Sequence, residues 1–177
     1  MDAFVALGPT VVADTPTVVR SAVAAATALL VGGILLTWFE GLLDRSVDAA
    51  VERPVLTIPY GAVAFGGVGF LGAFGYSQLI RVVGSGGAAT VVGALVVLVW
   101  LALAGFGFAV VGTAATAVWG ARDPAAGVVV GAAISGGVWL APTVGVGLAL
   151  WATVGAIGVG GPARRWIHAS RSVDGEH

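Results

Sequence analysis

The chain has 177 residues, of which 58% are hydrophobic and only 10% are charged. A water-soluble domain carries about 25% charged residues, so this chain has too few polar side chains to cover a water-facing surface. Its formal net charge of −1 excludes the basic surface of a nucleic-acid-binding protein, and its hydrophobicity excludes intrinsic disorder. We expect an all-α, polytopic integral membrane protein, a helical bundle with four to five transmembrane spans and the lipid bilayer as its main partner.

The N-terminal segment, residues 1–17, precedes the first apolar stretch. Residues 1–13 contain Asp2 and no basic residue, and Pro9 interrupts them. A secretory signal needs a basic start and an unbroken apolar run, so we expect this segment to be retained. The sequence leaves two alternatives for this segment: it lies in the membrane interface, or it is a frayed tail.

Charged residues are so sparse that they bound the apolar stretches directly. A bilayer core of about 30 Å needs about 20 helical residues. The first span is predicted over 18–39, with Trp38 at its end, where an interfacial aromatic residue is favoured. The second is predicted over 56–79, just after Pro54.

The connector 40–53 between these spans is the most polar internal segment. Its acidic residues recur every four positions and therefore share one helical face: Glu40, Asp44, Asp48 and Glu52. Another face carries an apolar strip: Leu43, Val47, Ala50 and Val51. This pattern predicts an amphipathic interfacial helix, whose acidic face is either a solvated surface or a docking site for a protein partner.

The third span is predicted over 89–119, and we expect it to tilt, or to bend at Gly105 and Gly107. The preceding Gly84-Ser85-Gly86-Gly87 has neither the strand and lysine of a phosphate loop nor a base for a serine nucleophile, so a flexible turn is expected. The next uncharged stretch has Pro142 near its middle. Proline interrupts a helix but fits the first turn of a new one, which predicts a tight hairpin of 125–141 and 143–161.

The arginines indicate an orientation. With five spans, Arg20 and Arg81 lie on one side, and the other six lie opposite, whereas four spans divide the arginines five against three. Because cytoplasmic loops are rich in arginine, five spans are favoured, although four stay open. We expect a multi-pass protein of the cell membrane with a polar cytoplasmic tail, 162–177, in which Arg164, Arg165 and Trp166 anchor the end of the last span.

Small residues at helical spacing predict close helix packing, because helices in lipid associate through backbone approach. One stripe is Ala62, Gly66, Gly69 and Ala73; a second is Gly127, Gly131 and Ser135; a third is Ala152, Ala156 and Gly160. We expect these faces to pack within the chain, and a homo-oligomer is open.

Residues with catalytic potential are scarce. No charged residue lies deep within a predicted span, because Arg20 is at the very start of the first one; the chain has no cysteine, and its histidines, His168 and His177, lie in the tail. A proton relay within a membrane needs buried ionisable groups. We therefore expect no enzyme activity, no catalytic or metal-binding residues and no cofactor, and we expect the hydroxyls of Thr27, Thr90, Thr113, Thr116, Ser135 and Thr153 to bond to helix backbone.

Short motifs in the second half carry a family resemblance. They are Arg53-Pro54, Gly105-Phe106-Gly107, Leu140-Ala141-Pro142-Thr143-Val144-Gly145 and Gly155-Ala156-Ile157-Gly158. Residues 52–166 resemble multi-span membrane domains of unknown function from haloarchaea and bacteria, some linked to bactofilin-like polymer-forming modules. All eight Lys or Arg positions are arginine, and alanine and valine dominate the apolar residues. This composition is similar to that of haloarchaeal proteins. The resemblance implies a membrane component serving an envelope or cytoskeletal scaffold, with no catalytic residues.

Two functions are therefore open. The first is a non-enzymatic structural or interaction protein, a membrane anchor for a scaffold or a partner of another membrane protein. The alternative is a small permease or channel subunit, whose pathway would be lined by glycine and hydroxyl residues around Gly105–Thr116 and the Pro142 hairpin. A continuous polar cavity would favour transport, and a dry, closely packed core would favour the structural function.

Overall fold

Every regular element in the described part of the chain is helical. The computed structural model describes residues 14–84, 86–118, 120 and 122–169. In chain order its elements are α3 (Thr17–Trp38), α4 (Glu40–Glu52), α5 (Pro54–Val83), α6 (Gly87–Val118), α7 (Pro124–Gly137), the 3-10 helix η1 (Val138–Leu140) and α8 (Val144–Ala169). The predicted all-α fold is confirmed. The segments 1–13 and 170–177 lie outside the described residues.

Four of these helices, α3, α5, α6 and α8, are long and apolar enough to cross a membrane. Large apolar side chains on them point outward; Leu30 is 69% exposed and Phe70 is 68% exposed. Lipid tails are as apolar as leucine, so a bilayer solvates this surface. The chain is a multi-pass membrane protein whose apolar helices contact lipid.

The predicted elements match the observed ones closely. Spans 18–39 and 89–119 correspond to α3 and α6, and the connector 40–53 corresponds to α4. The second span is longer than predicted, because α5 continues past Arg81 to Val83. The helix α6 is one continuous helix through Gly105 and Gly107.

The predicted hairpin around Pro142 is present as α7, η1 and α8, but its second arm does not end at Gly161. The helix α8 continues through Pro162 to Ala169, so much of the predicted polar tail is helical. Proline removes one backbone hydrogen bond within a helix, and membrane helices tolerate this where neighbouring elements support them. Here Gly161 packs on the backbone of α4 at Ala50.

The connections between helices follow from their residues. The connection between α5 and α6 begins at Gly84, whose φ of +79° is a conformation that suits glycine; of the Gly-rich segment, Gly87 already belongs to α6, and Ser85 lies outside the described residues. Before α7, Asp123 caps the helix: its Oδ1 accepts hydrogen bonds from the amides of Ala125 and Ala126 at 2.9 and 3.1 Å, which satisfies two otherwise unpaired donors.

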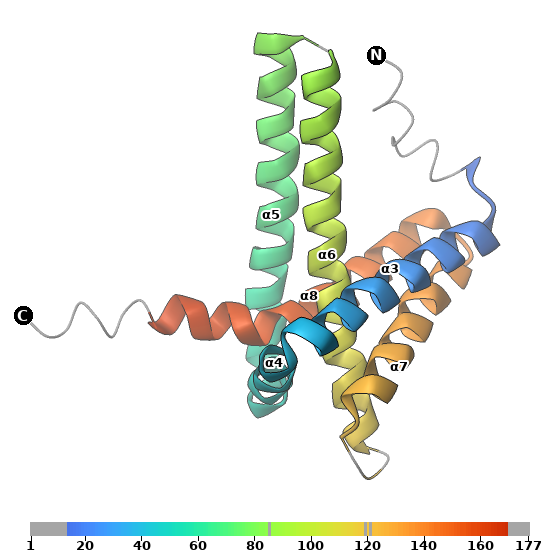
Figure 1. Ribbon diagram of the computed structural model, residues 1–177, viewed down its shortest axis with the longest axis vertical. Helices are drawn as coiled ribbons and strands as arrows, with labels where there is room; N and C mark the ends of the chain where they lie inside the picture. Colours follow the sequence, from blue (N-terminus) through green and yellow to red (C-terminus); the bar gives the residue numbers. More distant parts are fainter. Residues whose placement is uncertain (1–13, 85, 119, 121, 170–177) are drawn as a thin grey trace, which may run out of the picture.

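The helices are not packed uniformly (Figure 1). The helix α5 and the first half of α6 project together from the rest of the molecule, whereas α3, α4, α7 and α8 gather around the second half of α6. Most of the buried residues of α6 accordingly lie between Ala104 and Thr116. The core of the protein is therefore at this end of α6.

Glycines allow the helices at this core to touch through their backbones. A Cβ on Gly107 would overlap the carbonyl oxygen of Gly155 in α8, and one on Gly112 would overlap that of Gly127 in α7. A Cβ on Gly160 would similarly overlap the carbonyl oxygen of Thr57 in α5. We call the three resulting contacts the α6–α8, α6–α7 and α5–α8 seams.

The predicted small-residue stripes differ in how far they are buried. Gly127, Gly131 and Ser135 are all buried, and packing of Ala156 and Gly160 against α5 is also confirmed. In the stripe on α5 a Cβ on Gly69 would meet the Trp100 indole, whereas Ala62, Gly66 and Ala73 are exposed. This stripe lies largely on the projecting hairpin, where no other described helix covers it (Figure 1).

Candidate functional site

The acidic face of α4 is held by ion pairs to distant parts of the chain. Asp48 accepts a hydrogen bond from Arg122, in the loop before α7, at 2.7 Å. Glu52, one turn later, accepts one from Arg164 of α8 at 2.9 Å through Oε2, and Arg165 lies 3.8 Å from the same oxygen. These pairs place α4, the α6–α7 loop and the end of α8 at one side of the bundle.

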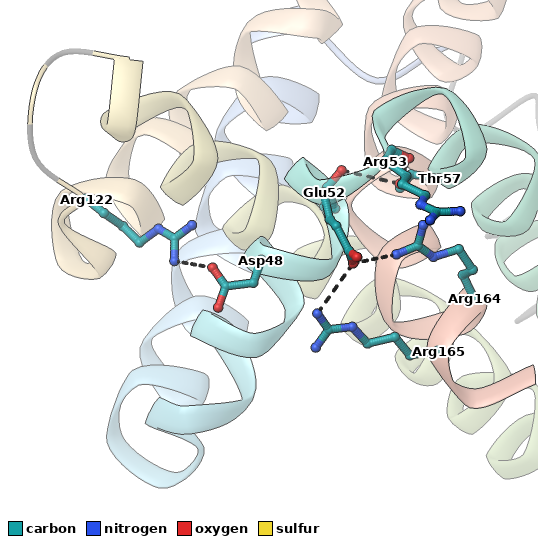
Figure 2. Close-up of polar contacts among 8 residues, drawn as sticks. Asp48, Glu52, Arg53, Thr57, Arg122, Arg164 and Arg165 are labelled. Atoms are coloured by element: carbon teal, nitrogen blue, oxygen red, sulfur yellow. Dashed lines mark hydrogen bonds and ion pairs between the residues drawn. The ribbon is translucent and has the colours of Figure 1, made fainter. Parts of the chain in front are cut away.

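Figure 2 shows how the three arginines near Glu52 are arranged. The Glu52 carboxylate lies between Arg164 and Arg165, and the guanidinium of Arg53 lies beside that of Arg164. The Arg164 side chain is only 12% exposed, whereas that of Arg165 is 49% exposed. We call Glu52, Arg53, Arg164 and Arg165 the arginine cluster.

A pocket of about 280 Å³ lies at the arginine cluster. The four residues of the cluster line it together with Leu56 and Tyr60 at the start of α5. The backbone that forms this wall is fixed by Thr57, which is fully buried and donates from Oγ1 to the carbonyl oxygen of Arg53 at 3.0 Å. The pocket thus combines charged side chains with an apolar wall at the entry to a membrane-spanning helix.

The predicted docking residues therefore have different surroundings. Asp48 and Glu52 form intrachain ion pairs, although their side chains stay 56% and 55% exposed. Asp44 is exposed on the same helix, and the Glu40 side chain lies outside what the structure describes. The apolar strip is confirmed at Leu43 and Val47, both fully buried. Val51, at 56% exposure, is not part of it. Docking by the acidic face stays a prediction.

The predicted topology anchors lie at the end of α8. Trp166 is 76% exposed, and its role as an interfacial anchor stays a prediction. Arg164 and Arg165 differ from a simple anchor because they also bond to α4.

A second polar arrangement lies in the core. The indole Nε1 of Trp151 donates to Ser135 Oγ at 3.1 Å, and that hydroxyl donates to the carbonyl oxygen of Ala24 at 3.2 Å. These bonds join α8, α7 and α3. Around Trp151 lie three further aromatic rings, those of Phe65, Trp100 and Phe108, with centroids 5.2–6.1 Å away.

Most of the predicted hydroxyl contacts are to helix backbone. Thr27, Thr116 and Thr153 bond to carbonyls of their own helices, and Ser135 bonds to a neighbouring one. Thr113 is an exception: its hydroxyl is buried against Gly127 with no hydrogen-bond partner. These hydroxyls contribute to packing, and none of them faces a catalytic base in the described residues.

The described residues show no candidate metal centre. They contain no group of three or more His, Asp or Glu side chains that could hold a metal ion, and the chain has no cysteine. What the arrangement can do is pair charges at the membrane surface and hold helices together within it.

Two tryptophans of the core and the pairing within the arginine cluster were not identified from the sequence. Trp100 and Trp151 lie in the middle of spans, away from the interfaces where tryptophan is favoured, and this position is a signal of burial that the sequence does contain. The pairing of Glu52 with Arg164 joins residues 112 positions apart, and no local pattern indicates it.

Comparisons with protein families, curated proteins and solved structures find no match to this chain.

Proposed function

We propose that this protein is a non-enzymatic, structural or interaction component of the cell membrane, which anchors an envelope or cytoskeletal scaffold. The observation that carries the proposal is the backbone contact of α6 with α7 and α8 at Gly107 and Gly112. These seams occupy the segment Gly105–Thr116, which the alternative function assigns, together with the Pro142 hairpin, to the lining of a solute pathway.

The side chains around the seams support the same conclusion. Phe108, Val110 and Thr113 are fully buried, and the Phe108 ring packs on Trp151 with centroids 5.9 Å apart. A pathway for polar solutes needs a cavity with convergent polar groups. A larger space, about 580 Å³, lies instead between α5 and α6 on the projecting hairpin, and its walls are mostly apolar, including Ile80, Val96 and Trp100.

The helix α4 is the surface best suited to a partner. Its apolar strip is buried at Leu43 and Val47. The ion pairs of Asp48 and Glu52 fix the helix to two other parts of the chain. A helix fixed in this way presents its exposed acidic residues, Asp44 among them, without further ordering cost. The choice of a filament-forming scaffold as the partner rests on the sequence motifs of residues 52–166 alone, and it is part of the proposal.

Affinity purification in mild detergent tests the proposal. A tagged protein that reproducibly recovers a filament-forming protein supports anchoring, and recovery should fall in Asp44→Asn but not in Asp14→Asn, which changes an exposed acid ahead of α3. A protein recovered alone that conducts solutes in liposomes would instead support the permease or channel function.

A further inference from the structure

The arginine cluster carries an excess of positive charge inside a pocket. Three guanidinium groups, those of Arg53, Arg164 and Arg165, line it together with one carboxylate, that of Glu52. The same carboxylate oxygen serves both Arg164 and Arg165. Since arginine stays charged and one acid cannot neutralise three, the pocket attracts a further anion.

The position of the pocket points to the membrane surface. Arg53 directly precedes the apolar helix α5, and Arg164 and Arg165 lie near the end of α8, next to the exposed Trp166. Such residues mark the level of lipid headgroups. The wall formed by Leu56 and Tyr60 belongs to the first turns of the apolar helix α5.

We propose that this pocket binds the phosphate group of an anionic phospholipid. Guanidinium is planar, and its fork of donors matches the oxygens of a phosphate. The apolar wall gives the glycerol and the first part of an acyl chain a surface that a free phosphate ion would leave unused. A lipid headgroup therefore fits the whole pocket, and inorganic phosphate fits only its charged half.

Glu52 has a defined part in this site. Its contact with the mostly buried Arg164 holds that side chain in position, yet its negative charge opposes the incoming phosphate at close range. Removal of this charge should thus strengthen anion binding, whereas a residue with a purely structural role would produce no gain.

Native mass spectrometry of the full chain in mild detergent, at about 0.15 M salt, measures the binding. We expect one molecule of phosphatidylglycerol to bind at least about tenfold more tightly than phosphatidylcholine, because a charge-assisted contact is commonly worth this factor. The double variant Arg53→Gln with Arg165→Gln should lose about tenfold or more. It keeps the pair of Arg164 with Glu52, so the fold should persist.

Two further variants sharpen the test. Arg45→Gln removes one positive charge from α4, where Arg45 donates to the Gly41 carbonyl of its own helix and does not line the pocket; lipid binding should not change. Glu52→Gln should bind phosphatidylglycerol more tightly than the unaltered protein. This gain does not depend on whether the double variant folds.

Three results would overturn the proposal. The first is equal binding of phosphatidylglycerol and phosphatidylcholine, and the second is unchanged lipid binding in the folded double variant. The third is displacement of the lipid by inorganic phosphate at a similar concentration, which would assign the pocket to a soluble anion.

Discussion

Gly158 of α8 lies against the backbone of Gly107 in α6, so closely that a Cβ on Gly158 would overlap the Gly107 carbonyl oxygen. The contact joins two helices that are each long enough to cross the membrane. Close backbone approach is the main source of helix association in lipid, so this pair fixes the spacing of the core.

The first prediction concerns this contact. Gly158→Ala should destabilise the protein by about 1–3 kcal/mol, because the added methyl group meets backbone atoms that cannot move aside independently. Thermal unfolding in detergent measures the change. Gly75→Ala is the matched control, since its Cβ would meet nothing within 4 Å, and alanine should be neutral or slightly stabilising there. Equal unfolding temperatures for the two variants would show that the seam is not tight.

The second prediction concerns the bond between Trp151 and Ser135. Ser135→Ala should cost about 1–2 kcal/mol, because it leaves the buried indole donor without an acceptor. A double-mutant cycle with Trp151→Phe, read from unfolding in detergent, should give a coupling near 0.6 kcal/mol, the size usual between membrane helices. Ser77→Ala serves as a control, as Ser77 donates to the Phe74 carbonyl of its own helix. Fully additive losses would contradict a direct bond.

The third prediction concerns the number of spans. At one end α7 adjoins Arg122, which pairs with Asp48; at the other, the carbonyl oxygen of Gly136 accepts a bond from Ser21 near the start of α3. The segment Pro124–Leu140 thus runs antiparallel to α3, and its length of about 25 Å is near the minimum for a crossing. We infer that α7 is a fifth span.

Cysteine labelling checks this inference, and the chain has no cysteine of its own to interfere. Asp44→Cys in α4 and Thr143→Cys in the turn before α8 are both at exposed positions. A membrane-impermeant thiol reagent should reach them from opposite sides of the membrane. Labelling from the same side would mean that α7 does not cross and that four spans are correct.

Much of the fold is predictable from the sequence because the charges that end each span are so few. The bounds of α3, α4 and α6 follow from the residues near Trp38, Glu52 and Arg122, and Pro142 marks the hairpin. The end of α8 is less predictable. Gly161-Pro162 ordinarily ends a helix, and the contacts that keep it helical here come from α4.

The candidate site is less predictable from the sequence than the fold is. Spacing alone places Asp48 and Glu52 on one face of α4, but their partners, Arg122 and Arg164, come from loops and helices far along the chain. Likewise, a stripe such as Ala62 and Gly66 indicates a packing surface without indicating whether a neighbour covers it, and here it is exposed.

The fourth prediction concerns the ion pair at the α6–α7 loop. Asp48→Asn should reduce stability by less than about 1 kcal/mol, since both partners are partly exposed and exposed pairs contribute little. Arg164→Gln should cost more in the same unfolding assay, because its side chain is 12% exposed and faces a carboxylate. The opposite order would mean that Arg122, not Arg164, holds α4 in place.

The most direct test of the proposed function compares partner recovery with solute flux for one preparation. Tagged protein is purified from native membranes in mild detergent, its partners are identified, and the same material is reconstituted in liposomes. We predict recovery of a filament-forming protein, reduced in Asp44→Asn and unchanged in Asp14→Asn, with solute flux no higher than in empty liposomes. Protein recovered without a partner, together with flux above that of empty liposomes, would contradict the anchoring function.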